Sequence, residues 1–283
     1  SMWPLAECLS GSTLQEPDIL RVSNPISIDT AYLRPNLLGG LLKVINHNVS
    51  RNTHDLNIFE IGRVFQLQGG KPAERTEIGI AVSGRRQPER YGAEKTENID
   101  FFSLKGLLES WLEARGLRNL RCEAAQHPAF LEGACASLSA GGKELLVFGE
   151  AAPALVKGIR LRFPLFIALG DMAVLESVSS QEKKHHGLPQ FPGTSRDISF
   201  VAPSALTHQK ILDTIAGMRL PMLEKVELFD IFADEKVLGS GRQSMSYSLT
   251  FCNPERTLTD DEVNKLQERV RSVLAGELGV ELR

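Results

Sequence analysis

The cysteine, histidine and acidic side chains are the groups in this sequence that could bind a metal or act as nucleophiles. The four cysteines show no CxxC pair and no regular interval, so their spacing specifies neither a zinc site nor a disulfide framework. They are Cys8, Cys122, Cys135 and Cys252. His185 and His186 are adjacent, and adjacent side chains point apart in a helix or a strand, so we interpret them as part of a solvated segment.

The charged groups that stand out elsewhere have structural interpretations. Thr259-Asp260-Asp261-Glu262 has the order of a helix capping box, which accounts for its carboxylates without a metal ion. Glu60 and Arg63 are the only charges of the apolar segment 56–65, and we interpret them as a structural ion pair or as surface charges. No nucleophile with a base, no phosphate-binding glycine loop and no metal constellation is found, so we predict no catalytic residue and no metal site.

Another kind of chemistry, the recognition of unpaired bases, is suggested by polar side chains that alternate with apolar ones. From Ser244 to Phe251, serine and threonine alternate with large apolar residues, in the cleanest period of two in the chain. Asp230 and Phe232 join this polar face if the preceding strand bulges near its end. An open sheet face with an aromatic ring and hydrogen-bonding groups can stack on and read bases, but the pattern alone favours a plain solvated face.

The charge of the C-terminal segment argues against nonspecific RNA binding. Residues 190–283 contain 11 Lys and Arg against 14 Asp and Glu, so their general affinity for phosphates should be low. An RNA site must then be local, with Arg196, Lys236 and Arg242 as candidate phosphate partners.

Composition indicates a soluble globular protein. The chain has 283 residues, 42% of them hydrophobic, a net charge of -3, and no apolar run near the roughly 20 residues of a membrane helix, so we predict no membrane partner. The scattered cysteines and the lack of a secretion signal indicate a reducing, cytoplasmic location. A serine ahead of Met2 suggests an excised fragment whose natural N-terminus is missing.

Hydrophobic periodicity predicts an α+β fold in the first part of the chain. Apolar residues at helical spacing predict a helix over 37–49. Residues 100–106 lead into a second predicted helix, through Leu107, Leu108, Trp111 and Leu112, that ends near Gly116. Glycines at 39 and 40 lower the helix propensity, so a close packing partner is expected there. Strands are predicted at 56–65 (buried), 77–82, 121–124, 134–139, 145–150 and 164–174. This mixture favours an antiparallel sheet with helices laid on it.

The second part follows a polar segment over 176–190, which we interpret as a linker. A first strand is predicted from the alternation of Asp197 to Phe200, and further strands are predicted over 223–232, 244–251 and 280–282. Helices are predicted from Pro203-Ser204 to Pro221 and from Thr259 to Gly279. The order β-α-β-β-α-β is the ferredoxin-like split motif, with both helices on one face of an antiparallel sheet. We therefore predict three segments: a first domain over 1–175, a linker over 176–190 and a second domain over 191–283.

Short motifs in the first domain resemble the beta subunit of bacterial phenylalanyl-tRNA synthetase. They are Asn24-Pro25-Ile26-Ser27, Leu33-Arg34, Leu37-Leu38, Phe59 to Phe65, Phe101 to Gly106, His127-Pro128 and Phe148 to Pro153. The resemblance implies a catalytic-like module with the antiparallel fold of class II synthetases, packed on a catalytic alpha subunit. An active enzyme of this class has an arginine for ATP at the end of its last strand, and the segment 169–175 has none.

The second domain resembles the ferredoxin-fold anticodon-binding domain that ends the same subunit. The matching motifs are Phe191-Pro192, Arg196 to Phe200, Val226 to Phe232, Ser244-Met245-Ser246, Leu249-Thr250-Phe251, Arg256 to Thr259 and Glu281-Leu282-Arg283. Carried over from the family, the tRNA-binding positions are Gly193, Thr194, Arg196, Asp230 and Phe232. Relatives often have tyrosine where this chain has Phe232, which keeps a stacking surface but lacks the hydroxyl.

The resemblance implies a role without chemistry of its own. The chain would bind the anticodon region of phenylalanine tRNA and assemble with the alpha subunit, in a complex of two alpha and two beta chains. The assembled enzyme would use ATP and magnesium to charge the tRNA, and neither would bind to this fragment. The alternatives are a pure protein-interaction scaffold and a ferredoxin-like amino-acid sensor.

Overall fold

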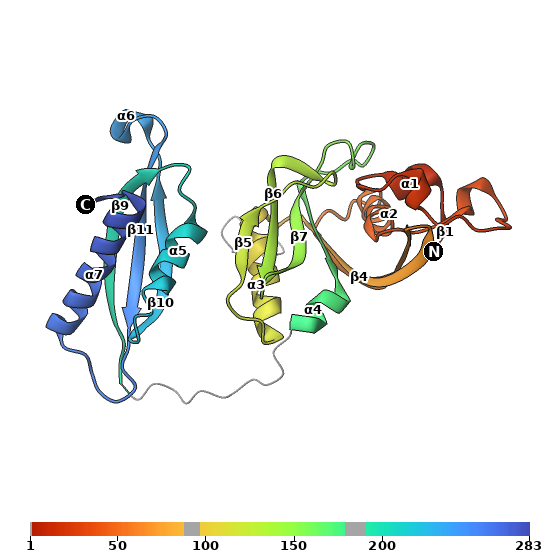
Figure 1. Ribbon diagram of the computed structural model, residues 1–283. Coiled ribbons are helices and arrows are strands. Elements are labelled where there is room, and N and C mark those ends of the chain that lie inside the picture. Colours follow the sequence, from red (N-terminus) through yellow and green to blue (C-terminus); the bar gives the residue numbers. More distant parts are fainter. Residues whose placement is uncertain (1, 88–96, 179–190) are drawn as a thin grey trace. The chain divides into compact units, whose positions relative to one another are not determined.

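The computed structural model describes residues 2–87, 97–178 and 191–283. The chain divides into two compact units, Ser1–Lys183 and Lys184–Arg283, and both are α+β with antiparallel sheets (Figure 1). Among the helices within these ranges, none is both long and apolar enough to cross a membrane.

The N-terminal unit is built on a six-stranded antiparallel sheet. Its strands, in order across the sheet, are β3 (Leu56–Gln68), β4 (Lys71–Ser83), β8 (Leu165–Asp171), β7 (Lys143–Ala151), β6 (Phe130–Ala140) and β5 (Arg121–Ala124). Its helices are α1 (Leu5–Leu9), α2 (Leu38–Val49), α3 (Phe101–Ala114) and α4 (Met172–Val178), and β1 (Met2–Trp3) pairs with β2 (Tyr32–Leu33). Two 3-10 turns, η1 (Glu16–Asp18) and η2 (Ile28–Thr30), complete the unit.

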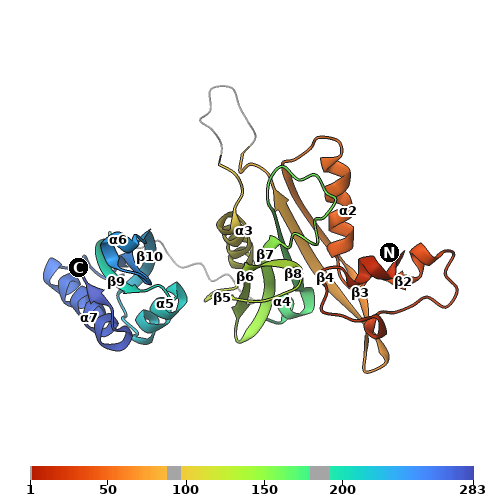
Figure 2. The same cartoon turned by 90° about the horizontal axis from the view of Figure 1, so that it is seen from above.

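Both faces of this sheet are covered. Leu104, Leu108 and Leu112 of α3 pack on one face in a core that includes Phe148. Leu38 of α2 belongs to a second core on the other face, and Figure 2 shows α2 lying along β3 and β4. The prediction of a close partner for the α2 glycines is confirmed, since a Cβ at position 39 would lie 3.7 Å from the Trp3 ring.

The prediction of a buried strand over 56–65 is wrong about burial. β3 is an edge strand that pairs with β4, and its outward residues Phe59 and Ile61 are 72% and 49% exposed. The apolar sequence matched a central strand, yet only one row of these side chains reaches a core.

The end of the last strand also differs from the prediction. β8 stops at Asp171, and residues 172–178 form α4, whose Leu175 is fully buried in the core beneath α3. Gly170-Asp171 interrupts the apolar run at this boundary, and Asp171 accepts a hydrogen bond from the Ala173 amide at 2.8 Å, so a local cap signal was present and was not used. The predicted domain end at 175 therefore falls inside a helix, and most of the predicted linker, 179–190, lies outside the described residues.

The C-terminal unit has a four-stranded antiparallel sheet in the order β10 (Leu223–Phe232), β11 (Arg242–Phe251), β9 (Thr194–Pro203) and β12 (Glu281–Leu282). Its helices are α5 (His208–Gly217), α6 (Glu235–Leu238) and α7 (Asp260–Leu278). The predicted βαββαβ order is confirmed, with the short α6 added between β10 and β11. α5 begins later than predicted, because Thr207 rather than Ser204 caps it.

Both long helices of this unit pack on one face of the sheet. Ile211 of α5 and Val270 of α7 share a core with Phe200, Tyr247 and Phe251 from the two central strands. The capping box predicted at Thr259 is present, and it begins α7. The sheet therefore has an apolar face beneath helices and a second face that carries the serines of β11.

Candidate functional sites

The serine face of the C-terminal sheet has an aspartate and an aromatic ring at one end. The pairing of β10 with β11 shifts between Leu228 and Asp230, which is the bulge on which the sequence prediction depended. Beyond it, Asp230 lies opposite Ser246 and Phe232 lies opposite Ser244, so both join the serine row. The hydroxyl groups of Ser199 and Ser246 are 2.9 Å apart on the neighbouring strands.

Sequence reasoning missed one aromatic residue at this bulge. Phe229 is the extra residue between Leu228 and Asp230, and 58% of its surface is exposed, against 44% for Phe232. The conflict between apolar and polar positions in the second half of β10 was the signal for a bulge, and the bulged residue itself could have been named from it.

The structure separates the five predicted site residues into two groups. The register places Thr194 opposite Phe251 and Arg196 opposite Leu249, and both partners are buried beneath the helices. Thr194 and Arg196 therefore lie on the helix-covered face, not on the serine face. Ser246 and Phe251 are five residues apart on β11, so Asp230 and Thr194 lie at positions about 17 Å apart along the strands.

Arg196 is occupied by contacts within the protein. Its guanidinium donates hydrogen bonds to Asp260 and Asn264 of α7 and to the Ser195 carbonyl oxygen. Gly193 precedes β9, and a Cβ there would lie 3.3 Å from the Phe251 carbonyl oxygen. Both residues thus help to fix the start of β9.

The other two candidate phosphate partners, Arg242 and Lys236, differ in their surroundings. Arg242 forms an ion pair with Glu281 at 2.6 Å, joining the start of β11 to β12. Lys236 is exposed on α6, in the connection that follows Phe232.

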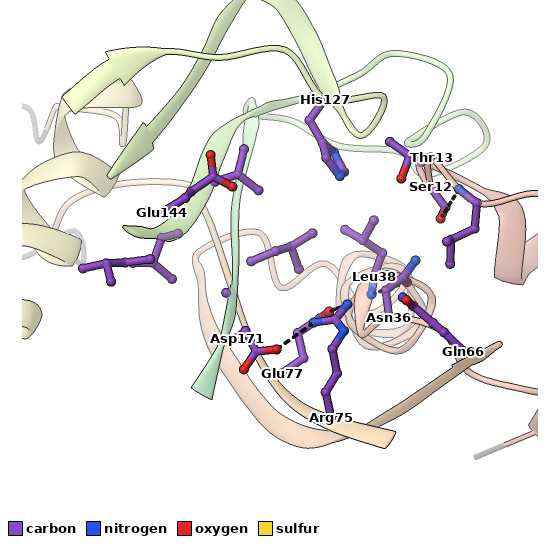
Figure 3. Close-up of a pocket in the computed structure, with 17 residues that line it drawn as sticks. Ser12, Thr13, Asn36, Leu38, Gln66, Arg75, Glu77, His127, Glu144 and Asp171 are labelled. Carbon is purple, nitrogen blue, oxygen red and sulfur yellow. Dashed lines mark hydrogen bonds and ion pairs between the residues drawn. The ribbon is translucent and has the colours of Figure 1, made fainter. Parts of the chain in front are cut away.

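The N-terminal unit contains a polar cavity of about 330 Å³ on the face of the sheet that α2 covers (Figure 3). It opens to solvent and is bordered by the segment after α1, the start of α2, the strands β3, β4, β7 and β8, and the loop before β6. The lining residues are Gly11, Ser12, Thr13, Leu14, Asn36, Leu38, Gln66, Arg75, Glu77, His127, Glu144, Leu145, Leu146, Val147, Leu169, Gly170 and Asp171.

A buried carboxylate lies at the floor of this cavity. Glu77 is only 3% exposed, receives a hydrogen bond from the Leu37 amide at 2.8 Å and pairs with Arg75 at 2.7 Å. Burial raises the pKa of Glu77, while Arg75 and the Leu37 amide act in the opposite direction. Arg75 also faces Asp171, with 3.9 Å between nitrogen and oxygen.

His127 forms the opposite wall and points into the cavity. Burial lowers its pKa, so the imidazole is neutral near pH 7. The Ala129 amide donates to its Nδ1, which leaves the proton on Nε2. Within the described ranges, no group of three His, Cys, Asp or Glu side chains is arranged to hold a metal ion.

The two charges of β3 have structural partners. Glu60 pairs with Arg34, whose Nε also donates to the Arg63 carbonyl oxygen at 2.8 Å. Arg63 pairs with Glu74 on β4 at 3.2 Å. The interpretation of Glu60 and Arg63 as structural charges is confirmed, although each pairs with another residue and not with the other.

Two family models match the chain along almost its whole length. The first, described as the phenylalanyl-tRNA synthetase beta chain CLM domain, matches residues 6–169, and the second, a ferredoxin-fold anticodon-binding domain, matches residues 189–283. The first match alone covers more than half of the chain. The chain belongs to the phenylalanyl-tRNA synthetase beta chain family.

Curated members of this family align with nearly all of the chain. The beta subunit of phenylalanine–tRNA ligase from Symbiobacterium thermophilum is 34% identical over 93% of this chain and 30% of its own length. The beta subunit from Streptococcus pneumoniae strain R6 is 30% identical over 96% of this chain and 34% of its own length. The chain thus spans about a third of the length of the curated relatives it matches.

Among solved structures, pyrrolysyl-tRNA synthetase from Desulfitobacterium hafniense has a TM-score of 0.44 at 18% identity, covering 60% of this chain and 58% of that one. This similarity is too low to assign a fold or a function. The residues matched by the CLM model include most of those that line the polar cavity. The residues matched by the anticodon-binding model include the whole serine face.

Proposed function

We propose that this chain is the C-terminal part of a phenylalanine–tRNA ligase beta subunit and that it works in the cytoplasm. It binds the anticodon region of phenylalanine tRNA and assembles with the catalytic alpha subunit during ATP-dependent charging. The family membership and the serine face support this function. The chain itself performs no chemical step.

The observation that carries the tRNA role is the bulge in β10. It brings the Asp230 carboxylate and the Phe232 ring to the same face as the serine hydroxyls. An exposed ring can stack on a base, and a carboxylate can accept hydrogen bonds from base amino or imino groups. The sequence pattern alone favoured a plain solvated face, and the bulged register shifts the balance toward base recognition.

The two groups of site residues have different roles in this proposal. Asp230 and Phe232 contact the bases directly. Gly193 and Thr194 lie near the far end of the sheet, where Thr194 is about 17 Å from Asp230 along the strands and on the helix-covered face. RNA bound to the serine face reaches them only by passing around the start of β9. Arg196 reaches the RNA only by exchanging Asp260 for a phosphate, and otherwise it positions the start of β9.

The edge of the N-terminal sheet supports an alpha-subunit partner. Phe59 and Ile61 lie on the outward row of β3 and are 72% and 49% exposed. Exposed apolar groups of this size on an edge strand are typical of protein contacts. We propose that the alpha subunit covers them.

In this proposal ATP and magnesium bind to the alpha subunit, because the cavity of this chain does not fit a nucleoside triphosphate. Glu77, Glu144 and Asp171 oppose a single guanidinium there, so triphosphate would meet an excess of negative charge. Where an active class II enzyme has an arginine, β8 passes into α4 through Asp171 and Met172.

The proposal is tested with Asp230→Ala and the matched control Glu277→Ala, which removes an exposed carboxylate from the helix-covered side. We expect Asp230→Ala to weaken binding of phenylalanine tRNA about tenfold at moderate salt, and Glu277→Ala to leave it unchanged. In the enzyme reconstituted with the alpha subunit, phenylalanine activation should be unaffected by either change. Loss of activation with unchanged tRNA binding would contradict the proposal.

A further inference from the structure

Two carboxylates are neighbours across the floor of the N-terminal cavity. Glu77 on β4 and Asp171 on β8 are directly opposite each other in the sheet register. Like charges in this relation destabilise a sheet. Arg75 lies between them, 2.7 Å from Glu77 and 3.9 Å from Asp171. An arrangement that opposes folding is more typical of a binding site than of a structural core.

The two carboxylates are not equally compensated. Glu77 forms an ion pair with Arg75 and accepts a hydrogen bond from the Leu37 amide. Asp171 uses Oδ1 to accept from the Ala173 amide at 2.8 Å, whereas its Oδ2 faces Arg75 at 3.9 Å, too far for a hydrogen bond. With His127 neutral, the Glu77 and Asp171 carboxylates share one guanidinium, and the exposed Glu144 lines the cavity apart from them (Figure 3). The charge on Asp171 is therefore only partly compensated, which favours a further cation beside it.

The remaining walls are apolar and limit the size of an occupant. Leu38, Val147 and Leu169 are among the apolar residues that line the cavity. A volume of about 330 Å³ is at the lower end of the range of about 300–1,000 Å³ for ligand pockets. In Figure 3 the charged cluster lies below this space and His127 lies across it, so both ends of a small molecule would meet polar groups.

We propose that this cavity binds a small organic ammonium ion, with its NH3+ group on Asp171 Oδ2 and its apolar body against Leu38, Val147 and Leu169. A simple amine and an α-amino acid both have this group. Arg75 and His127 Nε2 are the donors available to a carboxylate in the second case. The inference is independent of the tRNA role, since it uses residues of the other compact unit.

The test uses three probes with the same ring: 2-phenylethylamine, L-phenylalanine and 3-phenylpropionate. Each is titrated by calorimetry into the full chain, into Asp171→Asn and into Asp100→Asn. Asparagine retains the helix cap that each aspartate makes, and Asp100 caps α3 outside the cavity, so it is a matched control. Glu144→Gln provides a second cavity variant, and circular dichroism checks that every variant is folded.

We expect at least one ammonium probe to bind and 3-phenylpropionate not to bind. Asp171→Asn should weaken that binding about tenfold or more, Glu144→Gln should weaken it less, and Asp100→Asn should not change it. Binding of the amine alone would assign the site to amines, and binding of phenylalanine alone would assign it to amino acids. The inference is overturned if neither ammonium probe binds, if the carboxylate probe binds equally well, or if Asp171→Asn binds as the unchanged chain does.

Discussion

The two units of this molecule use antiparallel sheets in opposite ways. In the N-terminal unit, helices cover both faces of a six-stranded sheet, and the remaining space is a polar cavity with a buried ion pair. In the C-terminal unit, α5 and α7 cover one face of a four-stranded sheet. The other face carries the exposed Phe232 and Asp230 beside Ser244 and Ser246, which are only 6% and 9% exposed.

The coverage of a sheet limits the size of a ligand that its surface could accept. A sheet enclosed on both faces admits only molecules that fit between its side chains, whereas an open face can accept a nucleic-acid loop. The family match assigns the open face to the anticodon-binding domain, and the enclosed sheet to the CLM domain.

The largest expected effect concerns the independence of the two cores. Phe148 and Phe200 are fully buried, one in each unit, so Phe148→Ala or Phe200→Ala should cost about 3–5 kcal/mol of the unfolding free energy of its own unit. Calorimetry of each variant should show one transition moved and the other retained. A shift of both transitions by the same amount would mean that the units unfold as one.

The second prediction compares two exposed phenylalanines. Phe232→Ala should weaken tRNA binding by about 1–3 kcal/mol through lost stacking, and should leave alpha-subunit binding unchanged. Phe59→Ala should have the reverse pattern, with a loss of about 1–2 kcal/mol in binding to the alpha subunit. Each variant is the control for the other, and binding of both partners is measured by fluorescence titration. If either variant weakened binding of the tRNA and of the alpha subunit equally, the proposed separation of the two binding surfaces would be contradicted.

A smaller effect is expected at the helix caps. Asp100 accepts from the Ser103 amide at the start of α3, and Thr259 accepts from the Glu262 amide at the start of α7. Asp100→Ala and Thr259→Ala should each cost about 1 kcal/mol in urea unfolding, while Asp100→Asn and Thr259→Ser should cost much less. If an alanine variant has the same unfolding free energy as the unchanged chain, the observed cap contributes no stability at that site.

The smallest effect, a difference in pH dependence, has opposite signs in the two units. Burial raises the pKa of Glu77, so its contribution to stability is full below its unfolded pKa and is lost as pH rises through the raised folded value. Hydrogen bonds from Arg256 and Thr259 lower the pKa of Glu262 to about 2, so its contribution is present above its unfolded pKa and is lost as pH falls through about 2.

An NMR titration that follows the carboxyl carbon shifts should give Glu77 a pKa above the ordinary glutamate value and Glu262 a pKa below it. Glu77→Gln should flatten the decline in stability of the N-terminal unit above the unfolded pKa. Glu262→Gln should flatten the acid dependence of the C-terminal unit. Titration of both residues at an ordinary glutamate pKa would contradict the account of their surroundings.

Much of the fold could be predicted because period and capping signals are local. The alternation over 244–251 predicted β11, and Thr259 to Glu262 predicted the start of α7. The passage from β8 to α4 was missed although Gly170-Asp171 interrupts the apolar run there, because the apolar residues resume at Met172. The exposure of Phe59 depends on β3 lying at the sheet edge, which is set by strands distant in sequence.

The candidate sites were predictable only in part. Asp230 and Phe232 required a bulge, which the sequence raised as a condition and the register supplies. The position of Arg196 on the helix side was available from its parity with Ile198 and Phe200, since side chains alternate along a strand. The cavity was not foreseeable, because segments far apart in the chain bring its charges together.

The most direct test of the central claim is a titration of this chain with phenylalanine tRNA and with a variant altered only in its anticodon, at moderate salt to suppress contacts with phosphates alone. The account predicts tighter binding of the native anticodon by about tenfold, with the preference lost in Asp230→Ala. Equal binding of the two tRNAs, or no binding of either, would contradict the account and favour a scaffold that contacts proteins only.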